Sequence, residues 1–304
     1  EGFAEVAPAH NPAYASGIRQ FGEILPGARR VALFETAFYQ WVPEAGCRYA
    51  VPRAWHEAGI QRYGFHGASH KFVAERSAEL LGREDVAGIA RALYQNGPGE
   101  VEAPLRVISC HLGGSSSVTG IHNGVAMGTS MGFSPQSGLP QNNRVGDLDS
   151  GAIPFASKAL GLSLEEVERQ LTQESGLLGV SGVGNDMRDV RAAAVEGHQE
   201  SQLAIDLFVR EVRRWASSFL FELGGLEALV FTAGIGENNP WLREAVCAGL
   251  EEYGIVLDEA RNGEVRGDEG EISARGGKVR VFVVPANEEL VLAREVYRKV
   301  SSLN

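Results

Sequence analysis

Two glycine-rich turns each follow a run of β-branched, apolar residues, and their residue types suit the binding of an anion. The first is VISCHLGGSSSV (residues 107–118) and the second is LVFTAGIGENN (residues 229–239). Each pattern predicts a buried strand that ends in a turn without side-chain bulk, where backbone N–H groups can approach an anionic ligand closely. One such turn is common. Two in one chain, with arginine, aspartate and histidine clusters before and between them, favour a nucleotide phosphate site built from both sides.

The two turns predict different local geometries. HLGGSSS (residues 111–117) lies between two expected strands and lacks the GKS or GKT ending of a P-loop. Its N–H groups and serine hydroxyls could hold the β- and γ-phosphates, and a plain glycine-rich hairpin is the alternative. AGIGENN (residues 233–239) leads from a strand into a helix, whose N-terminus suits a phosphate or a ribose. A tight turn capped by Asn238 or Asn239 is the alternative there.

Arginine and histidine residues near these turns are candidates for phosphoryl chemistry. Arg144 and Arg188 lie inside glycine-rich loops, and arginine recognises carboxylate or phosphate through paired hydrogen bonds. Ordinary surface ion pairs are the alternative. His66, in YGFHGASH, could donate a hydrogen bond to a transferring phosphoryl group, and a capping or core histidine is the alternative.

Carboxylates form a further set of candidates. Glu35 is expected at a strand end, and Glu288 and Glu289 at a helix start. Acidic residues near helix N-termini often serve only the helix dipole. Near a nucleotide they would instead hold Mg²⁺ or its waters.

Composition limits the kind of protein that can carry such a site. The chain has 304 residues and a net charge of −11, and without a basic tract this charge argues against nucleic-acid and anionic-membrane partners. No apolar stretch reaches the roughly 18–20 residues that span a bilayer. Three cysteines without short spacing indicate buried apolar residues in a reducing compartment, so a cytoplasmic location is expected.

Strands that alternate with helices predict an α/β fold with a mixed sheet, which must position these residues. We expect strands at residues 30–34, 62–65, 228–232 and 279–284, and three strands from residue 105 with a hairpin at residues 122–124. Helices are expected at residues 13–25, 70–81, 150–160, 163–174, 186–195, 199–223, 240–253 and 288–300.

Taken in order, the motifs resemble the acetate kinase family, which shares a superfamily with sugar kinases, the Hsp70 ATPase and actin. The resemblance runs from APAHNP to NEELVLAREVYRKV and includes YGFHGASH, ISCHLGG, TSMGFSP, ESGLLGVSGVGNDMRDV and FTAGIGEN. It implies an actin-like, ribonuclease H-like ATPase fold of mixed five-stranded sheets with flanking helices and an incomplete first domain. The expected parts are an N-terminal remnant (1–50), a C-terminal nucleotide-binding domain (51–286) and a helix that returns to the N-terminal domain (287–304).

The resemblance implies direct, reversible transfer of a phosphoryl group from Mg·ATP to a short-chain carboxylate, giving an acyl phosphate and ADP. By position, it assigns His66 to transition-state stabilisation, Arg144 to the phosphoryl or carboxylate group, His10 and Glu35 to the active site and Glu288 to Mg²⁺. The nucleotide-binding positions that it implies are His111, Leu112, Gly113, Gly114, Ser115, Asp186, Met187, Arg188, Gly234, Ile235, Gly236, Glu237 and Asn238. It also implies a homodimer joined through the second domain.

Several positions depart from the family pattern. Glu35 stands where the family usually has Asp, Gly114 stands where its phosphate loop has Asn, and QNNR replaces GTR before the essential arginine. Ser115 or Ser116 could replace the donor absent at position 114. The family's N-terminal strands, with an NSGSSS-like loop and a substrate-binding arginine, have no counterpart before Glu1, so missing sequence is expected. An inactive, truncated nucleotide-binding relative is the alternative.

The acyl group is expected to lie against three residues. Phe65 and Pro135 match residues of the family's acyl-methyl pocket, and Ala9 stands where a leucine is usual. The smaller side chain makes room for one or two more carbons, each worth about 0.8 kcal/mol when buried. We therefore expect propionate to be accepted, and a kinase for butyrate or lactate is the alternative.

Overall fold

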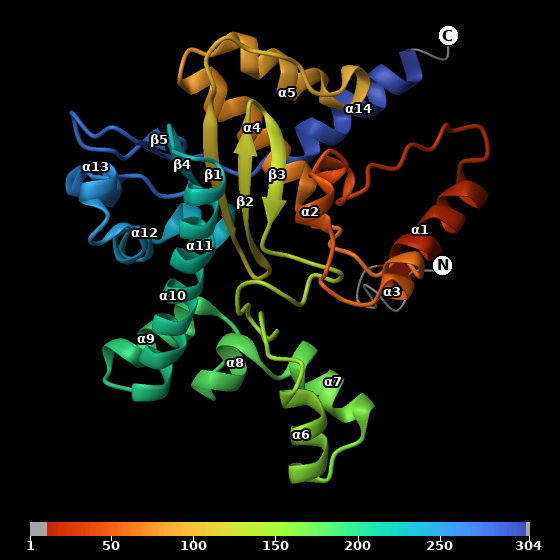
Figure 1. Ribbon diagram of the computed structural model, residues 1–304, viewed down its shortest axis with the longest axis vertical. Coiled ribbons are helices and arrows are strands. Elements are labelled where there is room, and N and C mark those ends of the chain that lie inside the picture. The colour runs from red at the N-terminus through yellow and green to blue at the C-terminus, as the bar shows by residue number, and fades with distance from the viewer. Residues whose placement is uncertain (1–10, 302–304) are drawn as a thin grey trace.

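Six strands form one mixed β-sheet within residues 11–301, the part of the chain that the computed structural model describes (Figure 1). Its strand order is β3-β2-β1-β4-β6-β5. β1 runs parallel to β4, and β4 parallel to β6, whereas the other neighbours are antiparallel. The strands are β1 (Arg106–Leu112), β2 (Ser116–His122), β3 (Val125–Thr129), β4 (Ala228–Thr232), β5 (Gly270–Glu271) and β6 (Arg280–Val283). The mixed sheet agrees with the expected α/β class. Its sixth strand, beyond the five expected, is the two-residue β5 at one edge.

Helices cover both faces of the sheet (Figure 1). α4 and α5 cover one face, and α10 crosses the other. The helices are α1 (Asn11–Ile24), η1 (Ala37–Tyr39), α2 (Glu44–Cys47), α3 (Arg53–Glu57), α4 (Gly67–Leu80), α5 (Glu84–Asn96), α6 (Ala152–Leu160), α7 (Leu164–Gln173), α8 (Gly176–Ser181), α9 (Met187–Val195), α10 (Gln199–Glu222), α11 (Ala233–Asn238), α12 (Pro240–Cys247), η2 (Glu251–Tyr253), α13 (Glu259–Glu264) and α14 (Glu288–Ser301).

The central strand β1 sorts its side chains by alternation. Ile108, Cys110 and Leu112 belong to the apolar cluster that includes residues of α10. Ser109 and His111 point the other way and hydrogen-bond to side chains of α4. Because successive residues of a strand face opposite sides, one strand supplies both the core and the polar contacts on which the candidate site depends.

Most of the elements predicted from the sequence are confirmed. Asn123 and Gly124 both have positive φ in the hairpin between β2 and β3, as a two-residue turn requires. Ser163 and Glu166 form the capping box that begins α7. α5 was not among the predicted helices, although it spans thirteen residues.

Two predicted strands are wrong. Residues 30–34 form no strand, because no described strand lies beside them to complete a ladder. Residues 62–65 are also irregular. The N–H groups of Tyr63 and Gly64 both donate to the Gly132 carbonyl, whereas a strand spreads its bonds along a partner. The β-branched or aromatic residues in these two segments favour a strand, but no strand forms because neither segment has a partner strand among the described residues.

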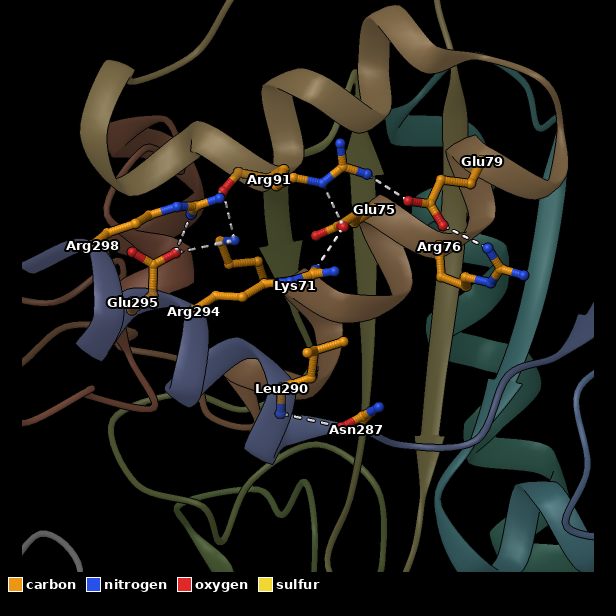
Figure 2. Close-up of polar contacts among 10 residues, drawn as sticks. All are labelled: Lys71, Glu75, Arg76, Glu79, Arg91, Asn287, Leu290, Arg294, Glu295 and Arg298. Atoms are coloured by element: carbon orange, nitrogen blue, oxygen red, sulfur yellow. Dashed lines mark hydrogen bonds and ion pairs between the residues drawn. The ribbon is translucent and has the colours of Figure 1, made fainter. Parts of the chain in front are cut away.

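Helix α14 is fastened to α4 and α5 by a network of charged side chains (Figure 2). Glu75 of α4, only 3% exposed, accepts from Arg91 of α5 at 2.8 Å and from Arg294 of α14 at 2.7 Å. Lys71 lies 3.6 Å from Glu295. Burial of charges is costly unless they are paired, so these contacts fix where α14, and Glu288 at its first turn, stands relative to α4.

Within the described residues, no helix is long and apolar enough to cross a membrane. Cys47, Cys110 and Cys247 are all free thiols, of which Cys110 and Cys247 are buried and Cys47 is only half-buried.

Candidate active site

His66 and Glu35 meet at the beginning of α4. His66 has a left-handed backbone conformation with φ of 60°, which is strained for a residue other than glycine. The next residue is Gly67, whose N–H donates to the Glu35 carbonyl at 2.9 Å. A Cβ at Gly67 would lie 2.1 Å from that carbonyl oxygen, so only glycine fits. The helix start therefore places the His66 imidazole beside the segment that carries Glu35.

Three histidines gather at the polar side of β1. The rings of His66 and His111 are stacked with their centroids 4.1 Å apart. Ser117 of β2 contacts His66 Nδ1 at 2.9 Å and His70 Nε2 at 2.8 Å through its hydroxyl. Ser69 contacts His111 Nδ1 at 2.8 Å. Hydroxyl contacts thus fix the orientation of all three rings.

Burial keeps two of these histidines neutral. Desolvation lowers the pKa of His111 to about 4. Desolvation, with the neighbouring His111, lowers the pKa of the fully buried His70 well below its usual value. Neutral imidazoles can both donate and accept hydrogen bonds, so this part of the cluster offers polar contacts without adding positive charge.

The turn after β1 is joined to Arg144. The Ser115 hydroxyl donates to Gln141 Oε1 at 2.7 Å, and Arg144 Nη1 lies 3.2 Å from both of those oxygens. Gln141 Nε2 donates to the Pro135 carbonyl at 2.7 Å. Desolvation lowers the pKa of the Arg144 guanidinium, but arginine remains charged in proteins. A fixed positive charge therefore stands beside the first glycine-rich turn and the expected acyl pocket.

The second glycine-rich segment adjoins the first. β1 and β4 are parallel, with His111 opposite Thr232, so both chains leave the sheet at the same edge. A Cβ at Gly113 would lie 3.5 Å from that of Ala233. The segment is itself the short helix α11, and the Asn238 side chain donates back to the Gly234 carbonyl instead of capping a helix start. The two segments form one edge, as the sequence predicts.

A buried arginine supports the second segment from below. Arg243 of α12 is fully buried and donates to the carbonyls of Gly236 and Glu237 at 2.8 Å. It also donates to the side chain and carbonyl of Asn262 and to the Val265 carbonyl. These acceptors are neutral, so Arg243 acts as a hydrogen-bonded brace that fixes the backbone of α11.

Two carboxylates, Glu35 and Glu288, lie near enough for the charge of one to act on the other. Glu35 remains exposed as a residue, but the surrounding protein removes much of the water from its carboxylate. This desolvation, helped by the Glu288 charge and opposed by N–H groups at the start of α4, raises the pKa of Glu35 to about 7. Desolvation and the neighbouring Glu289 likewise raise the pKa of Glu288. Glu237 of α11 joins the second glycine-rich segment to the residues just before α14, because its carboxylate accepts from the Ala286 N–H at 2.9 Å.

The remaining predicted residues stand at the margin or outside the description. Asp186 caps α9 and pairs with the exposed Arg188, away from the contacts that join the described parts of the two glycine-rich segments. Met187 is buried in the same apolar cluster as Ile235. Phe65 precedes His66 and accepts from the Tyr39 hydroxyl through its carbonyl. Ala9 and His10 lie outside the described residues.

Sequence reasoning missed the residues that support the site. Gln141 and Arg243 were not predicted to have a role, and Ser117 was expected only as one of the turn's hydroxyls that could hold a phosphate, not as a partner of the histidines. Ser117 carried a signal, because period-two alternation from Ser115 along β2 places it on the polar side opposite His111. Arg243 and Gln141 carried none, since their partners come from loops distant in sequence.

A cavity of about 730 Å³ lies beside the site, next to the segment that carries Pro135. Its walls include Tyr49, Arg62, Phe133, Asp149 and Arg214. None of the residues predicted for the site lines it, so it is distinct from the edge where the two glycine-rich segments meet.

The profile of the Acetokinase family matches residues 1–294. An acetate kinase of Shouchella clausii is 41% identical over 305 residues, which cover 99% of this chain and 72% of the relative. An acetate kinase of Heliobacterium modesticaldum is 44% identical over 299 residues, covering 97% and 70%.

Solved structures agree with these sequences. An acetate kinase of Porphyromonas gingivalis superposes with a TM-score of 0.85 at 37% identity, over 95% of this chain and 68% of that one. A propionate kinase of Francisella tularensis gives 0.85 at 35% identity, over 97% and 71%. The fold expected from the resemblance is thereby confirmed, and the alternative of an inactive relative finds no support. The chain belongs to the acetokinase family and is a phosphotransferase of the acetate and propionate kinase type.

Proposed function

We propose that this chain transfers the γ-phosphoryl group of Mg·ATP to acetate or propionate at the edge where the two glycine-rich segments meet, with His66 and Arg144 stabilising the transferred group. The observation that carries this proposal is the set of contacts that joins His66 to Ser117 on β2 and joins Ser115, two residues earlier, to Arg144. One imidazole and one guanidinium thereby flank a single turn of the backbone.

The reaction depends on positioning the carboxylate and the γ-phosphoryl group, and it needs no proton transfer. A carboxylate oxygen attacks the γ-phosphorus, the bond from that phosphorus to the bridging oxygen breaks, and the electron pair leaves with ADP. Charge spreads over the three equatorial oxygens during transfer. Fixed donors aimed at those oxygens lower the barrier because they need no reorganisation at the moment of reaction. Arg144 supplies a permanent charge, and the Ser117 contact orients the His66 ring.

Glu35 and Glu288 are the residues that fit Mg²⁺. Mg²⁺ is usually held by one or two carboxylates together with substrate phosphates and waters. Both carboxylates have a raised pKa, and Glu288 contributes to the shift at Glu35, so a divalent cation between them would relieve the repulsion. When bound, the cation would neutralise charge on the ATP phosphates.

The acyl group is proposed to lie between Phe65 and Pro135. The N–H groups of Tyr63 and Gly64 bond to Gly132, so the segment before His66 runs along the segment before Pro135. Arg144 contacts the Pro135 carbonyl at 3.5 Å. A carboxylate bound by Arg144 would therefore place its alkyl end toward these two residues.

We also propose a homodimer in the cytoplasm. Val212 and Phe219 of α10 are buried in the core, so this part of the helix serves the fold and offers no subunit contact. Phe155, Leu160 and Leu164 on α6 and α7 are instead each more than 60% exposed and support a subunit contact there. Light scattering on the purified chain measures the subunit number, and a monomer at micromolar concentration would contradict the dimer.

The test of function is ATP-dependent formation of acyl hydroxamate with acetate, propionate and butyrate, followed with and without Mg²⁺. We expect product with acetate and propionate that depends on Mg²⁺. Binding of ATP without turnover of any of the three acids would contradict the proposal.

A further inference from the structure

Gly114, at the tip of the first glycine-rich turn, lies beside the side chain of Asn142. Gly114 itself is exposed. A Cβ placed on it would lie 3.1 Å from Asn142 Nδ2 and 3.6 Å from Asn142 Cγ. The Asn142 carboxamide therefore lies in tight contact with the place that the Cβ of a residue at position 114 would take.

The backbone holds Asn142 in this place from two sides. Its N–H donates to the Gly114 carbonyl at 3.2 Å, and its carbonyl accepts from the Leu178 N–H of α8 at 2.9 Å. Its neighbour Gln141 binds Ser115 of the same turn. The backbone of Asn142 is thus fixed against the turn, although it comes from a loop almost thirty residues away.

One polar atom of this carboxamide has no protein partner. Asn142 Oδ1 is buried and makes no hydrogen bond to any described residue. A buried polar atom without a partner costs free energy. An amide oxygen only accepts hydrogen bonds, so a water or another donor would have to satisfy Oδ1. The atom of this carboxamide that can donate to an anion is Nδ2, which lies next to Gly114 at the tip of the turn.

The sequence departures at positions 114 and 142 are reciprocal. Gly114 stands where the family pattern has Asn. With QNNR aligned to GTR on the arginine, Asn142 stands where that pattern has Gly. A side-chain amide is therefore absent at position 114 and present at position 142, whose side chain lies beside Gly114.

The serines of the turn do not replace this amide. The Ser116 hydroxyl donates to the Gly113 carbonyl and accepts from the Gly113 N–H. The Ser115 hydroxyl donates to Gln141. Each hydroxyl has a single proton to donate, and both protons are already used within the protein.

We propose that the Asn142 carboxamide is a hydrogen-bond donor to the phosphates of ATP, in place of a side chain at position 114. The proposal rests on the proposed function, in which this turn holds the nucleotide phosphates. It adds one residue to the proposed site and accounts for two departures from the family pattern with one contact.

The test is a double-mutant cycle of Gly114→Asn, Asn142→Gly and the two combined, with Asn142→Ala added because alanine leaves the backbone no more flexible. A hydrogen bond to a charged group is worth about 1.5–3 kcal/mol, so Asn142→Ala should lower kcat/KM for ATP about ten-fold to a hundred-fold. Gly114→Asn should also lower it, because its side chain meets Asn142. The exchange of both residues should recover to within about three-fold of the wild type, a coupling that independent sites would lack.

Binding measurements separate a phosphate contact from a structural role. Calorimetry with ADP and with adenosine should show that Asn142→Ala weakens ADP and leaves adenosine unchanged, at an unchanged melting temperature. The matched control is Asn143→Ala, because Asn143 contacts Ser175 through its carbonyl, and it should bind ADP as the wild type does.

The outcomes distinguish this inference from the proposed function. If the wild type is an active kinase but Asn142→Ala keeps full kcat/KM for ATP, or the double exchange is no better than the poorer single variant, the role of Asn142 is overturned. If Arg144→Ala and Asn142→Ala both turn over as fast as the wild type, the location of the site itself is wrong.

Discussion

The two glycine-rich segments end neighbouring parallel strands, yet the protein holds them by opposite means. The turn after β1 is held by side chains such as Ser115 and Arg144, which our proposal also places next to the reactants. The segment after β4 is held from inside the protein by Arg243, which is fully buried and donates to backbone carbonyls. The first arrangement links structure to catalysis directly. In the second arrangement the supporting residue is separate from the reacting groups. Mutations at the first turn should therefore lower kcat, whereas mutation of Arg243 should first lower stability.

The largest effect on catalysis is expected at the first turn. Arg144→Ala and His66→Asn should each lower kcat about 10²–10³-fold, the usual cost of removing one transition-state donor. Asn is chosen for His66 because it tolerates the left-handed conformation. Steady-state kinetics should show this loss at a nearly unchanged melting temperature. Equal losses of kcat and of stability would remove the contrast between the two segments.

Arg243→Met should damage stability before catalysis. It leaves several buried carbonyls without a donor, at a cost of about 1–3 kcal/mol for each group that stays unsatisfied. We expect a lower denaturation midpoint and a raised KM for ATP, with KM for acetate unchanged. Arg243→Lys keeps some of the hydrogen bonds, so its denaturation midpoint and its KM for ATP should lie between those of the wild type and of Arg243→Met. A stable Arg243→Met variant with normal KM for ATP would show that α11 needs no brace.

The carboxylate pair extends the comparison to pH. Folding raises the pKa of Glu35 from 4.5 to about 7, so the folded chain binds more protons than the unfolded chain between these values. The resulting stability is present below pH 4.5 and is lost as the pH rises through 7. Urea unfolding at pH 5 and pH 8 should therefore show Glu35→Gln gaining stability relative to the wild type at the higher pH. Parallel changes in both proteins would contradict the raised pKa.

Gln141→Met should give a smaller loss. It removes the acceptor shared by Ser115 and Arg144 and the donor to the Pro135 carbonyl, but leaves Ser115 and Arg144 in place. We expect kcat to fall about three-fold to ten-fold, because each lost bond is worth only about 0.5–1.5 kcal/mol and acts on the reacting groups indirectly. Kinetics with saturating ATP measure it. A loss as large as that of Arg144→Ala would make Gln141 part of the reacting groups instead of their support.

The smallest effect concerns the acyl pocket. Ala9→Leu should lower kcat/KM for propionate relative to acetate about four-fold, since one buried CH₂ is worth about 0.8 kcal/mol. The ratio of the two acids in the hydroxamate assay measures this. An unchanged ratio would place residue 9 away from the alkyl group.

The sequence predicted the parts of the molecule that depend on local pattern. β1, β4 and the hairpin at Asn123 follow from apolar runs and turn chemistry. The capping box of Ser163 and Glu166 correctly predicted the start of α7. Residues 30–34 misled because a strand depends on a neighbour that its own sequence does not contain.

The candidate site was predictable residue by residue but not as an arrangement. His66, Arg144 and Glu35 were recognised from motifs. The structure joins His66 and Arg144 to serines on either side of one turn and places Glu35 beside His66 at the start of α4. Their supports come from elsewhere in the chain and depend on tertiary contacts that carry no local pattern. The reciprocal exchange at Gly114 and Asn142 belongs to this class, because each change looks like a loss until the two loops are seen in contact.

The most direct test of the central claim is a crystal structure with ADP, Mg²⁺, acetate and a planar metal fluoride that mimics the phosphoryl group in transfer. The account predicts that the fluoride lies over the turn at residues 113–115, within hydrogen-bond distance of the His66 ring and the Arg144 guanidinium. A fluoride bound in the cavity beside Tyr49 and Arg214, with neither His66 nor Arg144 in contact, would contradict it.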